Sequence, residues 1–424
     1  MKMSGSNEVF VRFRNDEKKD ILNIQFQYED YHFRFSNSFD KDSREFEENK
    51  IHPKTLSQLS FTDDSNISRE ISWPNLSHWQ SYHFFENQSL PYYFLQMSNE
   101  RTQNHYQIVI RVETSRIALF KKGIIQQWIM KTDTDSLSDQ KELIKQLVQF
   151  CKVHTNLMGL RVQPYMPGST SLDFAQQLLN QFGFIEAGPM ANVKTRMIDL
   201  RPPVEEILSS FSANGRARLK IKPKAQEVIE VKEINSLMEI PFLQDALNAS
   251  FNRSIKKECP YNFHPLFKRL TQFPSEVVML GFYFKEHHSR PMAFVTGIGH
   301  GNIVEYSVGG SLSDTRLRQF PFNHILMWQL ALRSKDNGVE FLDLGGISNG
   351  DDDDALMGIT NFKRFFPGFE LSTGREMEVE LRPRYIYFYT KFQNLVRCLD
   401  WIKTCTLFFV RLTNYKEFIC RQHI

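Results

Sequence analysis

The chain has 424 residues, of which 41% are hydrophobic and 24% charged, the balance of a soluble globular protein. This composition excludes overall intrinsic disorder, a collagen-like repeat and a polytopic membrane protein, and at about 150 residues per domain the length predicts two or three domains. The formal net charge of +3 is too small to indicate a partner.

Compartment is indicated by the cysteines and by the absence of targeting signals. Five cysteines without paired spacing are typical of a reducing compartment. The N-terminus leads into charged residues without the apolar core of a signal peptide, and no run of about 18 apolar residues exists to span a bilayer. We therefore expect a cytoplasmic protein.

Residues 1–72 are expected to form a separate N-terminal extension, partly strand and partly loop. Aromatic and polar residues alternate over residues 24–35, which predicts one or two strands with one buried face. Residues 36–72 are polar and acidic, which indicates a loop-rich segment. No catalytic motif stands in this extension.

A first α/β domain is predicted over residues 73–199, where the hydrophobic pattern becomes regular. Apolar runs and helical periods alternate, and Gly183 closes the second helix. The predicted strands are 107–112, 116–120, 159–162 and 195–200, and the predicted helices are 138–155 and 171–182. Strands and helices in this order indicate an α/β layer.

A second unit of similar element order is predicted over residues 200–375. It opens with a polar, basic helix from about 204 towards 226, which we expect to break near Pro223. The predicted strands are 227–231, 277–284, 291–298, 302–308 and 340–344, and the predicted helices are 236–252, 263–272 and 324–337. The fold class is therefore α/β with mixed sheets, in two tandem units.

The last segment, residues 391–424, is predicted to be a basic, aromatic C-terminal helix. Basic residues far outnumber acidic ones there, and aromatic residues lie between them. That pattern suits an anionic membrane surface or tRNA. The alternative is a terminal helix that packs its aromatic face on the body of the protein.

The sharpest local signal lies where the predicted strand 340–344 ends at Gly345 and Gly346. Glycines at a strand end allow positive φ or a close backbone approach. Lys363 and Arg364 follow on a segment that is dense in phenylalanine. A cation on an apolar segment suits an anionic substrate or a developing oxyanion. The alternative is a short helix whose lysine extends its charged end to solvent.

An ordered set of short motifs resembles the Fem peptidyltransferases, a branch of the GNAT-like acyltransferases, over about residues 75–390. The motifs are WQS (79–81), LRVQP (160–164), FGF (182–184), TRMIDL (195–200), RARLK (216–220), PMA (291–293), YSVG (306–309), DLGGI (343–347), GI (358–359) and FKRF (362–365). Each motif alone is weak, but their common order is fairly specific.

The resemblance implies two GNAT-like domains in tandem with a groove between them, and residues 376–390 returning to the first domain. Family members transfer an amino acid from aminoacyl-tRNA to an amine of a peptidoglycan precursor peptide. Lys363 matches the lysine proposed in the family to stabilise the oxyanion, and Phe362 would help to shape the site.

Substrate contacts and partners follow from the same resemblance. The expected substrate-binding residues, besides Phe362, are Arg364, Tyr306, Asp343, Gly345, Gly346 and Arg253. Arg216, Arg218 and Lys220 are expected to contact phosphate or tRNA, the alternative being a solvated helix face. The expected donor is aminoacyl-tRNA or an acyl carrier. The acceptor is a lipid-linked or nucleotide-linked peptide, reached in the cytoplasm or at the inner face of the plasma membrane.

Several departures from the family pattern concern the substrate. No lysine stands near Trp79, the long coiled-coil arm of some members is absent, and residues 351–354 form a run of four aspartates that we interpret as a solvated loop. Residues 313–322 lack the glycines that cradle the pyrophosphate of coenzyme A. We therefore predict no cofactor and no metal. An acyl-carrier thioester donor and a non-catalytic binding protein remain alternatives.

Overall fold

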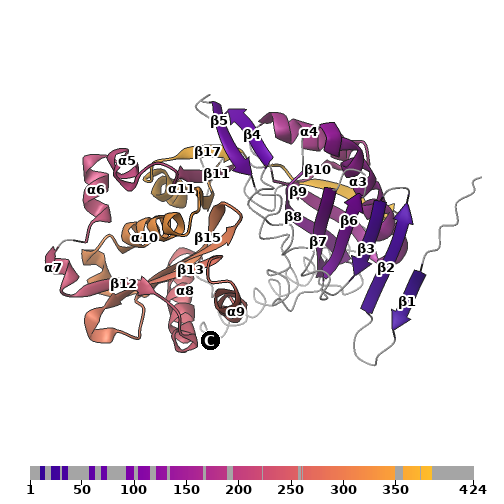
Figure 1. Cartoon of the computed structure of the whole chain (residues 1–424). Helices are drawn as coiled ribbons and strands as arrows, with labels where there is room; N and C mark the ends of the chain where they lie inside the picture. The colour runs from indigo at the N-terminus through magenta and orange to yellow at the C-terminus, as the bar shows by residue number, and fades with distance from the viewer. Residues whose placement is uncertain are drawn as a thin grey trace, which may run out of the picture.

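The computed structural model describes sixteen segments of the chain, and all structural statements concern these. They are 10–14, 21–28, 31–36, 57–62, 68–73, 92–99, 104–114, 121–130, 134–165, 169–188, 194–221, 223–255, 259, 261–348, 357–372 and 374–383. Two mixed α/β units lie beside each other (Figure 1). The expected basic helix at 391–424, the WQS motif and the four aspartates lie outside the described residues.

A nine-stranded sheet forms the first unit, in the order β1-β2-β3-β6-β7-β8-β9-β18-β10. Its strands are β1 (Phe10–Arg14), β2 (Ile21–Tyr28), β3 (Tyr31–Ser36), β6 (Tyr92–Asn99), β7 (Asn104–Thr114), β8 (Lys121–Trp128), β9 (Leu157–Pro164), β10 (Ile185–Glu186) and β18 (Met377–Glu380). Among them only β8 and β9 pair parallel. Three strands of the N-terminal extension thus continue this sheet, while β4 (Ser57–Thr62) and β5 (Ser68–Trp73) pair separately.

Helices α3 (Thr134–His154) and α4 (Ser169–Asn180) cover one face of this sheet. Their apolar residues pack against the inward side chains of β7, β9 and β18. Gly183, at φ +83°, ends the turn after α4, as expected. The second strand expected at 116–120 falls outside the described residues, and its place as partner of β7 is taken by β8.

The second unit is a seven-stranded sheet in the order β12-β13-β14-β15-β16-β11-β17. Its strands are β11 (Lys194–Asp199), β12 (Ile229–Glu233), β13 (Val277–Phe284), β14 (Ala293–His300), β15 (Ile303–Ser311), β16 (Phe341–Gly346) and β17 (Phe369–Ser372). Every residue of β13 is buried, because helices cover both faces of the sheet there. The predicted class of mixed α/β sheets in two units is confirmed.

Helices lie on both faces of this second sheet. They are α5 (Val204–Ser209), α6 (Ala213–Leu219), α7 (Pro223–Gln226), α8 (Ile240–Ile255), α9 (His264–Gln272), α10 (Phe322–Asp336) and α11 (Met357–Arg364), with the short 3₁₀ turns η3 (Leu237–Glu239), η4 (Lys285–His287) and η5 (Thr315–Gln319). The break expected near Pro223 is confirmed, because α7 begins there, but the single helix expected before it is wrong: α5 and α6 are two helices. Ser212 starts α6 by accepting a hydrogen bond from the Gly215 N–H, and Pro223 starts α7.

The chain passes between the two sheets in both directions. Strand β11 pairs with β16 and β17, so the chain joins the second sheet before residue 200, where the sequence placed the boundary. It leaves again between β17 and β18. Gly374 lies at that crossing with φ +144°, where a Cβ atom would come within 1.9 Å of the Pro164 carbonyl oxygen.

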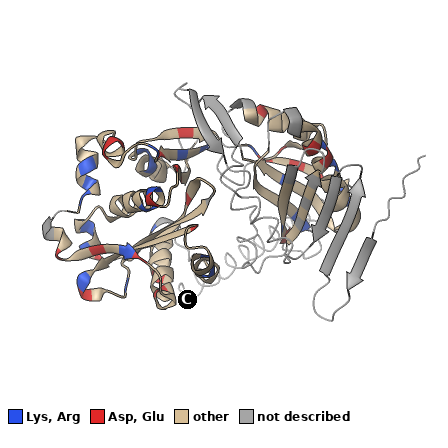
Figure 2. Ribbon diagram, in the orientation of Figure 1, with Lys and Arg blue, Asp and Glu red and all other residues tan. Residues whose placement is uncertain are grey.

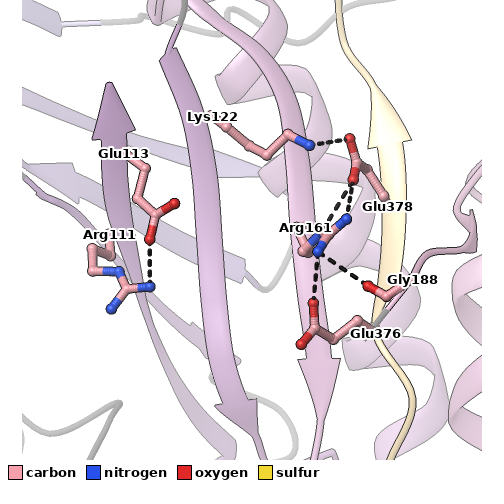
Figure 3. Close-up of polar contacts among 7 residues, drawn as sticks. All are labelled: Arg111, Glu113, Lys122, Arg161, Gly188, Glu376 and Glu378. Carbon is pink, nitrogen blue, oxygen red and sulfur yellow. Dashed lines mark hydrogen bonds and ion pairs between the residues drawn. The ribbon is translucent and has the colours of Figure 1, made fainter. Parts of the chain in front are cut away.

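Arg161 ties the returning strand to the first sheet. Its guanidinium donates to Glu376 at 3.0 Å, to Glu378 at 3.0 Å and to the Gly188 carbonyl at 3.2 Å. Figure 3 shows Arg161 between the two glutamates, with Lys122 on the other side of Glu378. The ion pair of Arg161 with Glu376 is largely shielded from solvent, since the Glu376 side chain is only 4% exposed.

Candidate active site

Strands β15 and β16 pair over a short stretch and then part. Their parallel register joins Ile303 to Phe341, Val304 to Leu342 and finally Glu305 to Asp343. Directly afterwards β15 carries a bulge, since Thr296 and Gly297 of β14 face Val308 and Tyr306 and leave Ser307 without a register partner. The last register pair of the two strands is therefore a pair of carboxylates.

These carboxylates face the first unit. Ile303 and Phe341 belong to an apolar cluster that also contains Tyr165 of the first unit. Side chains two residues apart on a strand share a face, so Glu305 and Asp343 continue this same face. Neighbouring strands are about 4.8 Å apart, which brings the two carboxylates close together.

Lys363 reaches this place from α11. Its side chain is buried, with 4% of the residue exposed, and its Nζ donates to the Gly346 carbonyl oxygen at 2.5 Å. The Ser348 N–H donates to the Thr360 hydroxyl at 2.8 Å, which fastens the turn after β16 to α11. Thr360 and Lys363 are three residues apart and form the buried side of that helix.

Asp343 is held by three donors from three elements. They are the Tyr165 hydroxyl at 2.9 Å, the Gly345 N–H at 2.7 Å and the Thr195 hydroxyl. Burial raises the pKa of Asp343, although these bonds and the Lys363 charge oppose the rise. Burial and the nearby Asp343 likewise raise the pKa of Tyr165.

Gln127 brings a second contact from the first unit. Its Nε2 donates to Glu305 Oε2 at 3.5 Å, and its φ of +49° is the one positive value among the described residues other than glycine. Burial and the charge of Asp343 raise the pKa of Glu305 to about 8. Burial lowers the pKa of Lys363 to about 8, against the pull of both carboxylates.

The cluster of Glu305, Asp343 and Lys363 is therefore a mixed-charge site between the two units. A lysine cation with little water around it interacts strongly with a negative charge that develops beside it. Perturbed pKa values in a shielded cluster of this kind are typical of functional sites.

Phe362 lies on the neighbouring side of α11, in a group of aromatic rings. The His324 ring of α10 packs on Phe362 and Phe365, with centroids 5.2 and 4.3 Å away. Burial, and then the charge of Arg218, lower the pKa of His324. Phe362 thus connects Lys363 to the core of the second unit.

Other predicted residues lie apart from the cluster. Tyr306 packs into the core of the second unit, and burial raises its pKa to about 12. Arg253 donates to Ser313 at 2.8 Å and to the Ser311 carbonyl and hydroxyl. Arg364 is exposed and pairs with Glu370 at 2.6 Å. These three side chains thus have polar or apolar partners other than Glu305 and Asp343.

Of the basic residues predicted to contact phosphate, Arg216 and Arg218 lie on α6, which carries basic segments in Figure 2, and Lys220 is the residue that caps its C-terminus. Arg216 donates to the Phe211 carbonyl oxygen at 2.5 Å, so it caps the preceding turn. Arg218 and Lys220 are exposed, and the Arg218 guanidinium stands 5.8 Å from the centre of the Phe365 ring. The open basic surface of α6 therefore consists of Arg218 and Lys220.

Sequence reasoning missed Glu305 of the cluster and three residues that hydrogen-bond to its carboxylates: Gln127, Tyr165 and Thr195. Glu305 had one visible signal, a lone charge inside an apolar strand. The described segments contain no group of three His, Cys, Asp or Glu side chains placed to hold a metal ion. Within those segments, every helix is too short or too polar to cross a bilayer.

Residues 281–375 match the sequence model of the FemAB family. This stretch includes β15, β16 and α11, and with them Glu305, Asp343 and Lys363. The match confirms the Fem-like resemblance expected from the sequence for this part of the chain. No curated protein matches the chain.

Among solved structures the chain is similar to FemX, at 12% identity and a TM-score of 0.63, over 74% of this chain and 95% of that one. Similarity also extends to L-PGS from Bacillus licheniformis (12% identity, 84% and 97% coverage, TM-score 0.43) and to a tandem GNAT protein from the clavulanic acid biosynthesis pathway (9%, 68% and 83%, 0.40). The likeness to FemX is one of fold, and it confirms the expected tandem arrangement of two α/β units.

Proposed function

We propose that the protein is a Fem-like aminoacyltransferase. It moves an aminoacyl group from the ester of an aminoacyl-tRNA to an amine of a cell-envelope precursor peptide. One observation carries this proposal: a buried lysine cation, Lys363, stands beside two carboxylates where β15 and β16 part. The family match over residues 281–375, which contains this arrangement, supports it.

The chemistry needs little beyond positioning and charge. The acceptor amine nitrogen bonds to the ester carbonyl carbon, and the carbonyl π electrons move to its oxygen. Lys363, which is mostly protonated at pH 7 with its pKa at about 8, stabilises that oxyanion. Collapse of this intermediate breaks the bond to the ribose oxygen and leaves an amide.

Arg218, on α6, and Lys220, at its C-terminal cap, are the residues that we assign to the tRNA backbone. Both are exposed, whereas Arg216 is occupied with the Phe211 carbonyl. Phosphate contacts by exposed cations make affinity salt-dependent. The acceptor is a peptide linked to a nucleotide or to a lipid, and a lipid-linked acceptor brings the reaction to the inner membrane surface.

The test is transfer of a labelled amino acid from charged tRNA to nucleotide-linked or lipid-linked precursor peptides. Lys363→Met is expected to lower kcat about 10²–10³-fold, the usual cost of removing one oxyanion donor. The matched control is Lys145→Met, because Lys145 is an exposed lysine on α3 that pairs with Glu142. It should transfer at the wild-type rate.

The alternatives give different results in the same assay. Transfer from an acyl-carrier thioester but not from tRNA would replace the donor and keep the site. Precursor binding without turnover would indicate a non-catalytic protein. Equal rates for the Lys363 and Lys145 variants would contradict the role of Lys363.

A further inference from the structure

We propose that Glu305 is the proton shuttle of this transfer: its carboxylate accepts a proton from the attacking amine and returns one to the leaving ribose oxygen. The proposal rests on the proposed function and adds a second catalytic residue to it. It starts from the register of β15 and β16, which places Glu305 beside Asp343 on the face directed at the first unit.

The two neighbouring carboxylates are not equivalent. Asp343 is 2% exposed, and it accepts hydrogen bonds from Tyr165, from the Gly345 N–H and from Thr195. Glu305 is less buried than Asp343, and the Gln127 amide that donates to it at 3.5 Å comes from the first unit, across the boundary between the two units. Asp343 therefore serves as the fixed counter-charge of Lys363, and Glu305 as the carboxylate that exchanges a proton.

Lys363 and Glu305 suit two different tasks in the transfer, stabilisation of the oxyanion and transfer of the proton. The groups that interact with Glu305 include Asp343 of β16, Lys363 of α11, Gln127 of β8 and Tyr165 after β9. Burial and the Asp343 charge bring the pKa of Glu305 to about 8, much nearer to that of an amine than an ordinary carboxyl is. Proton transfer is efficient when donor and acceptor have similar pKa values.

The step balances without another reactant. The ammonium of the acceptor gives one proton to the Glu305 carboxylate, and the neutral nitrogen then forms the bond to carbon. The C–O bond to the ribose breaks as the oxyanion collapses, and the Glu305 carboxyl protonates the leaving oxygen. The remaining N–H proton is released to water, and the products are an amide and an alcohol.

The experiment compares Glu305→Gln with Glu286→Gln, an exposed glutamate on the η4 turn, in the transfer assay. We expect Glu305→Gln to lose about 10²-fold or more in kcat/KM, the usual share of a general base. Hydroxylamine, which is already neutral at pH 7, serves as a second acceptor. With it the deficit of Glu305→Gln should shrink at least tenfold, while the deficit of Lys363→Met should stay.

The pH profile is a second readout. With the peptide acceptor, wild-type kcat/KM should rise towards pH 8 as Glu305 loses its proton, and fall above it as Lys363 loses its own. In Glu305→Gln the rise should move to higher pH, where the amine itself loses its proton. Glu305→Asp keeps a carboxylate and should retain the wild-type rise at a lower rate, which answers the case in which the glutamine variant fails to fold.

Each result has one meaning. No transfer by wild-type protein overturns the proposed function and the shuttle with it. Wild-type transfer together with an unimpaired Glu305→Gln overturns the shuttle alone. An equal deficit of Glu305→Gln with peptide and with hydroxylamine also overturns it, because a merely structural role would not depend on the acceptor.

Discussion

At the scale of single residues, Gly345 determines how closely the backbone at the end of β16 approaches the Lys363 side chain. Its φ is +77°, and a Cβ atom there would stand 3.6 Å from Lys363 Nζ. Its own N–H donates to Asp343. One residue thus links the backbone conformation after β16 to both charges of the site.

Gly345→Ala is expected to destabilise the protein by about 1–2 kcal/mol, because left-handed backbone costs about that much for a residue with a Cβ atom. Urea unfolding followed by circular dichroism measures the change. Gly358→Ala is the control: Gly358 lies in α11 with no atom within 4 Å of its added Cβ, so alanine should stabilise or leave stability unchanged. Equal effects of the two substitutions would refute the argument.

Single residues also show what the sequence could predict. Lys363 and Gly345 stand in a contiguous pattern of strand, glycines and aromatic helix, which can be read along the chain. Glu305 becomes a site residue only through its register with Asp343, which lies far along the chain, and Gln127 only through contact between the units. Pairings of this kind depend on tertiary structure, which local patterns do not contain.

At the scale of elements, the ion pairs on β9 and β7 are expected to contribute very different amounts to the free energy of unfolding. Arg161 is 14% exposed and Glu376 4% exposed, whereas Arg111 on β7 pairs with Glu113, whose side chain is 46% exposed. Figure 3 shows both pairs, with strand β8 between β7 and β9. The shielded pair belongs to the attachment of β18, and the exposed pair lies two strands away from β9 on the same sheet.

Arg161→Met is expected to destabilise the protein by about 3 kcal/mol, because it leaves the buried Glu376 carboxylate without its cation. Arg111→Met should cost less than about 1 kcal/mol, as exposed pairs do. Denaturant midpoints at low and at high salt measure both. A loss for Arg161→Met that is as small as that of the control, or that vanishes in salt, would show that the pair is solvated.

Elements also explain the error in the segment after residue 200. Helical periodicity and basic charge are continuous up to Pro223, so the pattern alone predicts one helix before that residue. The Ser212 side chain instead accepts a hydrogen bond from the Gly215 N–H, and a new helix begins there. Serine side chains compete in this way for backbone groups that a continuous helix would bond. The pattern predicts strands β13 and β14 well, because their apolar runs are long and a polar turn separates them.

At the scale of the whole molecule, Tyr165 of the first unit and Asp343 of the second share a buried hydrogen bond of 2.9 Å. Tyr165→Phe and Asp343→Asn in a double-mutant cycle should show a coupling of about 1 kcal/mol or more in unfolding free energy. Tyr165→Phe with Glu286→Gln should be additive, since Glu286 lies on the η4 turn. Additivity in the first cycle would mean that the two units are not coupled through this bond.

The return of the chain through β18 governs the order in which the protein can be completed. Strand β18 lies between β9 and β10, and Glu376 and Glu378 hold Arg161. The ribosome makes β9 and β10 early but makes β18 only after the entire second sheet. Domains usually fold as they emerge, N-terminal first. Until β18 is made, the sheet of the first unit lacks the strand between β9 and β10. The unit that is synthesised first is therefore completed last.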